Sequence, residues 1–392
     1  MKLVDTIADP IFTFPIEAAR FFPTHLNQIL THYRQLITAV DDEFRPIIQE
    51  HLPGITETCL NLLAATDAAF KGNIVHANNI FSQIINKLEP YLVYPDKNYV
   101  KMNPAHLFKA RRVMDGQFGL TDMFHVPFEK RYEINTTRFS LPGVPCLYLS
   151  NSIYTCWEEL ERPAFAQMPV SRFELSGKNF KFLDFSNSND LIKHSIVRRA
   201  YVPNPTITEE KEKEMFDETL ELIRTFLLPR YLQAFPLMAA CYIKVFNRKH
   251  HFKPEYIFPQ MVMQWIMTQD DIDGISYLST KSRPLGDDFF SFLQNFLNYA
   301  IPIRSFKETG YCDTMVNRIK LTEPLTFELF SIRNPVAATK TINYDKDIKN
   351  KFFPSPIHRV SLGEKIVPYM ETTFGILEHE LMKAPVKHLE IK

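Results

Sequence analysis

The first hundred residues carry an apolar periodicity that fits helices and little else. Between residues 26 and 44, apolar side chains recur every three or four positions and so share one helical face. They are Leu26, Ile29, Leu30, Tyr33, Leu36, Ile37, Val40 and Phe44. Further helices are predicted over residues 55–71, stopped by Gly72, and over 74–88, before Pro90. We therefore expect residues 1–95 to form an all-helical region with a regulatory or structural role.

The pattern changes near residue 100 to short β-prone pieces separated by Pro and Gly. These pieces are residues 146–149, 170–175, 180–185 and 274–278. They predict a mixed α/β (α+β) domain over residues 96–392. Between them, Thr206 and Glu209 form a capping box that predicts a charged helix ending at Pro229. We expect this helix to be an insertion at about 206–229, with its EEKEKE run in solvent.

Composition excludes several classes of protein. Lys plus Arg and Asp plus Glu both number 45, so no excess charge favours nucleic acid or an anionic membrane as a partner. Only 11 glycines occur, with neither a GxGxxG sequence nor a P-loop, so any nucleotide must be held in another way. The longest apolar run, residues 234–243, is far shorter than the roughly 20 residues that span a bilayer. No membrane partner is expected.

The compartment predicted from the sequence is the cytoplasm. The five cysteines are odd in number and show no CxxC spacing, which argues against a disulfide framework and a zinc knuckle. Asp5, Asp9, Pro10 and Pro15 interrupt the N-terminal apolar residues, so a signal peptide is not expected there. No metal site is expected either, because HExxH is absent and the run Glu378 to Glu380 lacks a convincing ligand set.

One stretch carries a recognisable set of polar residues. Residues 138–159 read RFSLPGVPCLYLSNSIYTCWEE, with Arg138, a turn at Pro142 and Gly143, a strand through Tyr148 and a helix reaching Glu159. This arrangement resembles the RES domain, in which an Arg precedes a turn, a Leu-Tyr-Leu strand follows ten residues on, and a Glu lies eleven residues beyond the Tyr. Both spacings agree here.

A later stretch extends the resemblance. Residues 273–279 read DGISYLS, similar to the family's Gly-Ile-x-Tyr-x-Ser strand, whose serine faces the same pocket and corresponds to Ser279. Residues 254–266 also look like the helix before that strand, so the resemblance covers about residues 100–305. One departure is the family's early Tyr-Arg-like dipeptide, where this chain reads LFKARR. Lys109, Arg111 or Arg112 is the substrate-binding candidate at that place.

The resemblance implies an ADP-ribosyltransferase-like fold, NAD as substrate rather than cofactor, and cleavage of the nicotinamide–ribose bond. That chemistry needs a grip on the pyrophosphate and stabilisation of an oxocarbenium-like ribose. Arg138 offers a donor fork for a phosphate or ribose, and Tyr148 a ring for the nicotinamide or ribose. Glu159 is the predicted catalytic carboxylate, because the family spacing selects it over Glu158, which points about 100° away on a helix. Ser279 would bond the ribose or the nicotinamide amide.

Other hypotheses stay open. The same site could transfer ADP-ribose to a protein or small molecule, or could bind a nucleotide without turnover. Cys146 and Cys156 lie beside apolar residues and are interpreted as packing rather than as nucleophiles. Because NAD loss would harm the cell, the resemblance implies control by an antitoxin or immunity partner, with the helical N-terminal region as an alternative. A homo-oligomer is a further open prediction.

Overall fold

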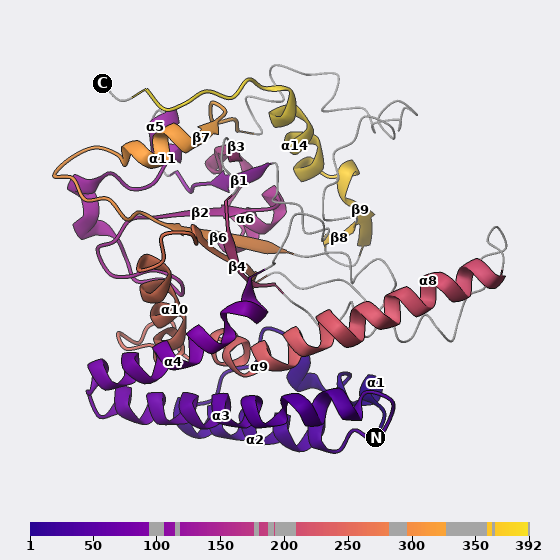
Figure 1. Ribbon diagram of the computed structural model, residues 1–392. Helices are drawn as coiled ribbons and strands as arrows, with labels where there is room; N and C mark the ends of the chain where they lie inside the picture. The colour runs from indigo at the N-terminus through magenta and orange to yellow at the C-terminus, as the bar shows by residue number, and fades with distance from the viewer. Residues whose placement is uncertain are drawn as a thin grey trace. The chain divides into compact units, whose positions relative to one another are not determined.

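The computed structural model describes residues 1–93, 106–113, 118–175, 180–186, 192, 209–281, 296–326, 359–362 and 365–390 (Figure 1). It divides into two compact units. A helical unit comprises Met1–Asp96 and Leu183–Thr268, and a sheet unit comprises Lys97–Phe182 and Gln269–Lys392. The first division, after Asp96, lies close to the boundary expected near residue 95, but Leu183–Thr268 groups with the N-terminal helices rather than with the sheet domain expected over 96–392.

The helical unit is organised around one fully buried helix, α9 (Leu228–Tyr242). Helices α2, α3 and α4 pack against it, and the Tyr33 hydroxyl donates to the Leu232 carbonyl at 2.8 Å. The helices are α1 (Leu3–Thr6), α2 (Phe22–Thr38), α3 (Arg45–Phe70), α4 (Ile74–Leu92), α8 (Glu209–Leu222), α9 and α10 (Ile257–Met267), with short 3-10 turns at Pro10–Phe12 and Pro254–Tyr256. The apolar run that the sequence places at 234–243 is thus core helix. Among the described residues, no helix is both long and apolar enough to cross a membrane.

The predicted helices exist, but several of their ends were wrong. The first helix ends at Thr38 rather than near Phe44, because Val40 and Phe44 are buried from the connection that follows it. The second begins at Arg45 and runs through Pro53. Pro229 does not end α8. A π-turn at Ile223–Leu227 leads directly into α9, and Pro229 lies where π geometry changes to α geometry, so it does not end the helix. Thr206, the predicted cap, lies outside the described residues.

The sheet unit is built on an antiparallel sheet, which confirms the mixed α/β (α+β) prediction. Its strands are β1 (Leu107–Ala110), β2 (Cys146–Ser150), β3 (Val170–Leu175), β5 (Gly274–Leu278), β6 (Leu297–Pro302) and β7 (Ile319–Leu321). The full seven-strand order is β4-β5-β6-β2-β1-β3-β7, and the chain passes from one unit to the other within β4 (Phe182–Phe185). The pairs from β5 to β7 along this order are antiparallel.

Smaller elements complete the sheet unit. They are α5 (Leu120–Met123), α6 (Ile153–Glu159), α11 (Asp313–Arg318), α14 (Thr373–Lys383), a hairpin of β8 (Arg359–Leu362) and β9 (Lys365–Pro368), and 3-10 turns at Phe128–Glu133, Phe165–Gln167 and Tyr369–Glu371. The predicted strands 170–175 and 274–278 match β3 and β5 in both bounds.

Each face of the sheet contributes to its own core. Leu107, Leu147, Leu149, Leu297 and Tyr299 pack on one face with Phe124 and Met315. Phe108, Ala110 and Val170 pack on the other with residues of α6 and α14, including Ile153 and Leu377. Because side chains alternate along a strand, Tyr148, Ser150 and Asn298 lie on the α6 face. This face is where the polar candidates can meet.

Two glycines are needed for this geometry. Gly143 has a φ of 69°, and the Val144 N–H donates to the Leu141 carbonyl, so the predicted Pro-Gly turn before β2 is confirmed. Gly274 begins β5 where a Cβ would lie 2.3 Å from the Ala300 carbonyl oxygen of β6. Only glycine permits that approach, so the glycine of the DGISYLS stretch brings β5 against β6.

Candidate active site

Helix α6 is anchored at its first turn. The Ser152 side chain caps the helix by accepting from the Thr155 N–H at 3.0 Å. The Ile153 N–H donates to Glu378 Oε1 of α14 at 2.7 Å. These bonds satisfy two of the N–H groups that a helix start leaves without an internal partner. With its start fixed directly after β2, α6 ends at Glu159.

The chain reverses sharply after α6. Glu161 and Arg162 have φ values of 64° and 58°, two consecutive non-glycine residues in the left-handed region. Such a conformation is costly for L-residues and persists only where the surroundings enforce it. The Arg162 Nε donates to Glu158 Oε2 at 3.0 Å, and its guanidinium lies over the Trp157 ring, 5.5 Å from the centroid. This clamp holds the tight turn beside Glu159.

The Glu159 carboxylate is fixed by two strands. Ser279, directly after β5, donates through Oγ to Glu159 Oε1 at 2.7 Å, and Asn298 of β6 donates through Nδ2 to the same oxygen at 2.6 Å. Asn298 is itself oriented by Ser150 of β2, whose Oγ donates to Oδ1 at 2.6 Å. Ser150, Ser279 and Asn298 are all buried, whereas the Glu159 side chain is 30% exposed. A partly accessible carboxylate therefore ends a buried hydrogen-bond chain.

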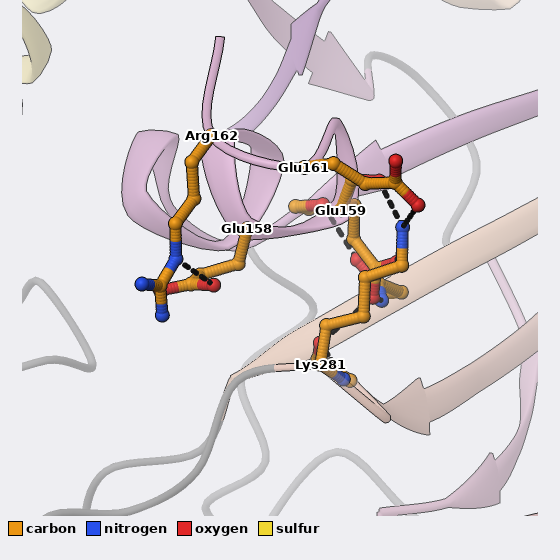
Figure 2. A network of polar contacts seen from close by, with 8 residues as sticks. Glu158, Glu159, Glu161, Arg162 and Lys281 are labelled. Atoms are coloured by element: carbon orange, nitrogen blue, oxygen red, sulfur yellow. Dashed lines mark hydrogen bonds and ion pairs between the residues drawn. The ribbon is translucent and has the colours of Figure 1, made fainter. Parts of the chain in front are cut away.

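Lys281 adds a positive charge to this site (Figure 2). Its Nζ donates to the Glu159 carbonyl, lies 3.9 Å from Glu159 Oε2 and lies 3.7 Å from Glu161 Oε1. The lysine thus ties the end of α6 to the segment after β5. It also places a cation beside a partly exposed carboxylate, in a position to attract an anionic group of a ligand.

Adjacent glutamates on α6 have different surroundings. Glu158 is 5% exposed and pairs with Arg162, away from the strand cluster, whereas Glu159 faces Lys281 (Figure 2). The 100° step between neighbouring helix positions separates the two side chains. Of the two, Glu159 is the carboxylate that reaches Ser279.

Tyr148, Arg138 and Glu159 each interact electrostatically with a fourth residue, Tyr277 of β5. The Tyr148 hydroxyl donates to the Phe139 carbonyl at 2.8 Å and lies 2.5 Å from Thr137 Oγ1. Burial raises the pKa of Tyr277 well above its usual value. The nearby Tyr148 and Glu159 raise it further, and the positive charge of Arg138 opposes them. Arg138, Tyr148 and Glu159 are therefore all within electrostatic range of the Tyr277 hydroxyl.

The cationic candidates of the LFKARR stretch do not join this group. Lys109 lies between Phe108 and Ala110 of β1, so its side chain is on the sheet face opposite Tyr148, and its Nζ donates to the Phe124 carbonyl at 2.6 Å. Arg111 donates to the Asp122 carbonyl at 2.6 Å. Both side chains are engaged by the α5 region, and Arg112 is exposed. Lys109 is thus on the other sheet face from Tyr148, and Arg111 is hydrogen-bonded to the α5 region.

Cys146 and Cys156 are poorly suited to nucleophilic chemistry. Burial raises the pKa of each thiol to about 12, so the thiolate is disfavoured at neutral pH. The Cys156 Sγ donates to the Phe108 carbonyl at 3.4 Å. Both thiols behave as packing groups.

Two site residues were missed by the sequence analysis, Asn298 and Lys281. Asn298 carried a usable signal, because it is an amide in the otherwise largely apolar stretch LNYAI, and a buried amide needs hydrogen-bond partners. Lys281, two residues after Ser279, carried none, since isolated lysines are most often solvent-exposed.

Comparison with known proteins found a similar protein that is named as a toxin. The chain is 33% identical over 294 residues to a Bacillus subtilis (strain 168) protein named "Putative toxin YopC". The aligned part is 73% of this chain and 60% of that protein, so the chain spans less than two thirds of its relative. No protein-family model matches the sequence, and no solved structure matches it. The similarity is therefore to part of a protein that is named as a toxin, and the RES resemblance stays a prediction.

Proposed function

We propose that the protein is a toxin whose sheet unit cleaves the nicotinamide–ribose bond of NAD, by hydrolysis or phosphorolysis. The observation that carries the proposal is the Glu159 carboxylate, partly exposed and held on one oxygen by Ser279 and Asn298. Two supports come from outside the geometry, the similarity to a protein named as a toxin and the RES-like order of Arg138, Tyr148, Glu159 and Ser279.

The proposed chemistry uses the fixed carboxylate as an electrostatic and hydrogen-bonding group. Because both donors hold Oε1, Oε2 is the oxygen turned to a ribose 2′-hydroxyl or to the positive charge that develops as nicotinamide leaves. A carboxylate whose position is set before binding needs no reorganisation in the transition state. In a hydrolase, the same oxygen also orients the attacking water.

The neighbouring residues supply binding. Arg138 grips the pyrophosphate or adjacent ribose through its planar donor fork. The ring of Tyr148 or of Tyr277 packs on the nicotinamide or its ribose. Lys281 contributes a second positive charge for the phosphates. Since NAD loss would harm the producing cell, the proposal includes neutralisation by an antitoxin or immunity protein.

The test is to incubate the purified full chain with NAD, with and without phosphate, and to identify every product by mass spectrometry. Free nicotinamide with ADP-ribose indicates hydrolysis, and ADP-ribose 1″-phosphate formed only with phosphate indicates phosphorolysis. ADP-ribose attached to a protein would replace the proposal with transferase activity. Saturable NAD binding without nicotinamide release would replace it with nucleotide sensing.

The adjacent glutamates provide a matched pair of variants. Glu159→Gln keeps the size of the side chain but removes its charge, so NAD turnover should fall about 100-fold or more with NAD affinity little changed. Glu158→Gln loses charge at the neighbouring position and should retain most of the activity. Initial rates and calorimetric affinities measure both effects. An active Glu159→Gln variant, whatever Glu158→Gln does, refutes the proposed catalytic residue.

A further inference from the structure

Three exposed phenylalanines from distant parts of the helical unit meet on one surface. The ring of Phe70, at the end of α3, lies 6.2 Å from the ring of Phe21 and 5.8 Å from that of Phe252, measured between centroids. Phe21 is 58% exposed and Phe252 is 62% exposed. Ile74, Val75 and Phe246 are exposed beside them in the chain. Grouped exposed apolar side chains of this size mark a binding surface more often than isolated ones do.

The segments that carry these rings are strongly basic. Residues 20–25, 70–76 and 246–253, here called the basic aromatic patch, contain no Asp or Glu. Their cationic residues are Arg20, Lys71, Arg248, Lys249 and Lys253, joined by His25, His76, His250 and His251. Close to the patch, Asp67 pairs with Lys71 and Glu17 pairs with Lys244. In a chain with 45 cationic and 45 acidic residues, this is a concentrated excess of positive charge.

The same unit offers a complementary surface on α8. Glu214, Asp217, Glu218 and Glu221 are exposed, and their spacing of three, four and seven puts them on one helical face. Among the described residues, the substantial contacts of α8 are with the π-turn that continues it. The exposed acidic face of α8 thus has the charge that the basic aromatic patch would bind.

These two surfaces cannot meet within one helical unit. In Figure 1 the turn between α3 and α4 lies at one end of the unit, while α8 runs outward at the opposite end. We infer that the basic aromatic patch of one copy of this chain binds α8 of a second copy. A reciprocal two-fold pair would satisfy both patches and both helices, so the expected assembly is a closed dimer. The exposed aliphatic side chains of Ile74 and Val75 beside the rings favour a protein partner, because such side chains gain from burial in a protein interface.

The test is the mass of the full chain in solution, measured by sedimentation velocity between about 0.1 and 100 μM. The parent should pass from monomer to dimer as concentration rises. Glu214→Lys with Glu218→Lys reverses charge on α8, and Arg20→Glu with Lys249→Glu reverses it on the patch. Each double variant should weaken dimerisation at least tenfold, because like charges would then face each other across the contact.

Recombination of the two changes gives the decisive comparison. A chain with all four reversals restores opposite charges across the contact and should dimerise again. The matched control is Lys2→Glu with Lys130→Glu, two exposed lysines outside the patch segments, whose reversal changes net charge as the patch variant does and should leave the dimer intact. Circular dichroism and thermal melts check that all variants fold.

Three outcomes would overturn the inference. The first is a parent that stays monomeric over the whole concentration range. The second is self-association that neither double variant weakens. The third is a monomeric chain that binds a single-stranded oligonucleotide or phosphatidylserine vesicles through Arg20 and Lys249, which would assign the patch to another class of partner. None of these results depends on whether the protein consumes NAD.

Discussion

Glu378 should make the sheet unit less stable as the pH rises from mild acid to weak alkali. Its carboxyl is 1% exposed, and its Oε1 accepts from the Ile153 N–H and from the Tyr369 hydroxyl. Burial raises the pKa of Glu378 from 4.5 to about 8, although both hydrogen bonds oppose the rise. At neutral pH the folded protein therefore holds this carboxyl mostly protonated at the start of α6.

The sign and size follow from proton linkage. Between pH 4.5 and about 8 the folded state binds more protons at Glu378 than the unfolded state, so the free energy of unfolding falls as pH rises. The stabilising contribution is complete below pH 4.5 and is lost as pH passes through about 8. The slope approaches 1.4 kcal/mol per pH unit, which gives a loss of about 2–3 kcal/mol between roughly pH 5.5 and 7.5.

Glu378→Gln isolates this effect. Glutamine can accept the same two hydrogen bonds but cannot ionise. The free energy of unfolding of the variant should therefore lack the pH dependence that Glu378 contributes. Relative to the parent, the variant should gain about 2–3 kcal/mol between roughly pH 5.5 and 7.5. Comparing the two chains cancels other titrating groups, including Lys109, whose pKa burial lowers to about 7 and which acts in the opposite sense at higher pH.

The measurement is urea unfolding at several pH values. At each urea concentration a short hydrogen-exchange pulse, given at one fixed pH, labels the unfolded protein. Peptides from β2 and α6 report the sheet unit separately from the helical unit, which avoids assuming a single transition. Glu380→Gln, on the same helix but less buried, is the control for the loss of a glutamate charge from α14. A Glu378→Gln variant that differs from the parent by a constant amount at every pH would refute the reasoning.

Three further perturbations follow from the same contacts. Asn298→Leu removes a donor from Glu159 and the acceptor of Ser150, so stability to urea should fall by about 1–3 kcal/mol and NAD turnover at least tenfold; unchanged rates would show that Asn298 does not position the carboxylate. Arg138→Lys should weaken calorimetric NAD affinity, and Arg138→Ala should weaken it about 10- to 100-fold; unchanged affinity would remove Arg138 from the binding site. Deleting residues 1–95 removes the helices that cover α9, so the product should be insoluble on fractionation, and a soluble, folded product would contradict this.

Local signals predicted four strands of the seven-stranded sheet, missed β1, β6 and β7, and predicted the helix ends poorly. Residues 170–175 and 274–278 match β3 and β5 because Pro and Gly punctuate the chain around them. Apolar spacing predicted too long a first helix, because Val40 and Phe44 are buried without being helical. The start of α3 was missed because Pro53 lies inside it. Gln233 of α9 donates to the His51 carbonyl beside that proline, a tertiary bond that no local pattern contains.

The site shows the same division between local and tertiary information. Motif spacing was enough to nominate Glu159 and Ser279, and the structure joins them by a hydrogen bond across 120 residues of chain. The part played by Asn298 depends on the register that pairs it with Ser150 between β2 and β6, which is set by packing of the whole sheet. Spacing also nominated Lys109, but strand alternation turns its side chain to the other face.

Glu158 and Glu159 of α6 have different surroundings because side chains at neighbouring helix positions point about 100° apart. Glu158 is buried against Arg162 and stabilises a left-handed turn that these residues would not adopt alone. That turn brings Glu161 to Lys281 and fixes the end of the helix on which Glu159 stands. Glu158 therefore helps to position Glu159 through the backbone, and its own side chain does not contact the Glu159 carboxylate. Replacing Glu158 should first lower the stability of the turn, whereas replacing Glu159 should first lower NAD turnover.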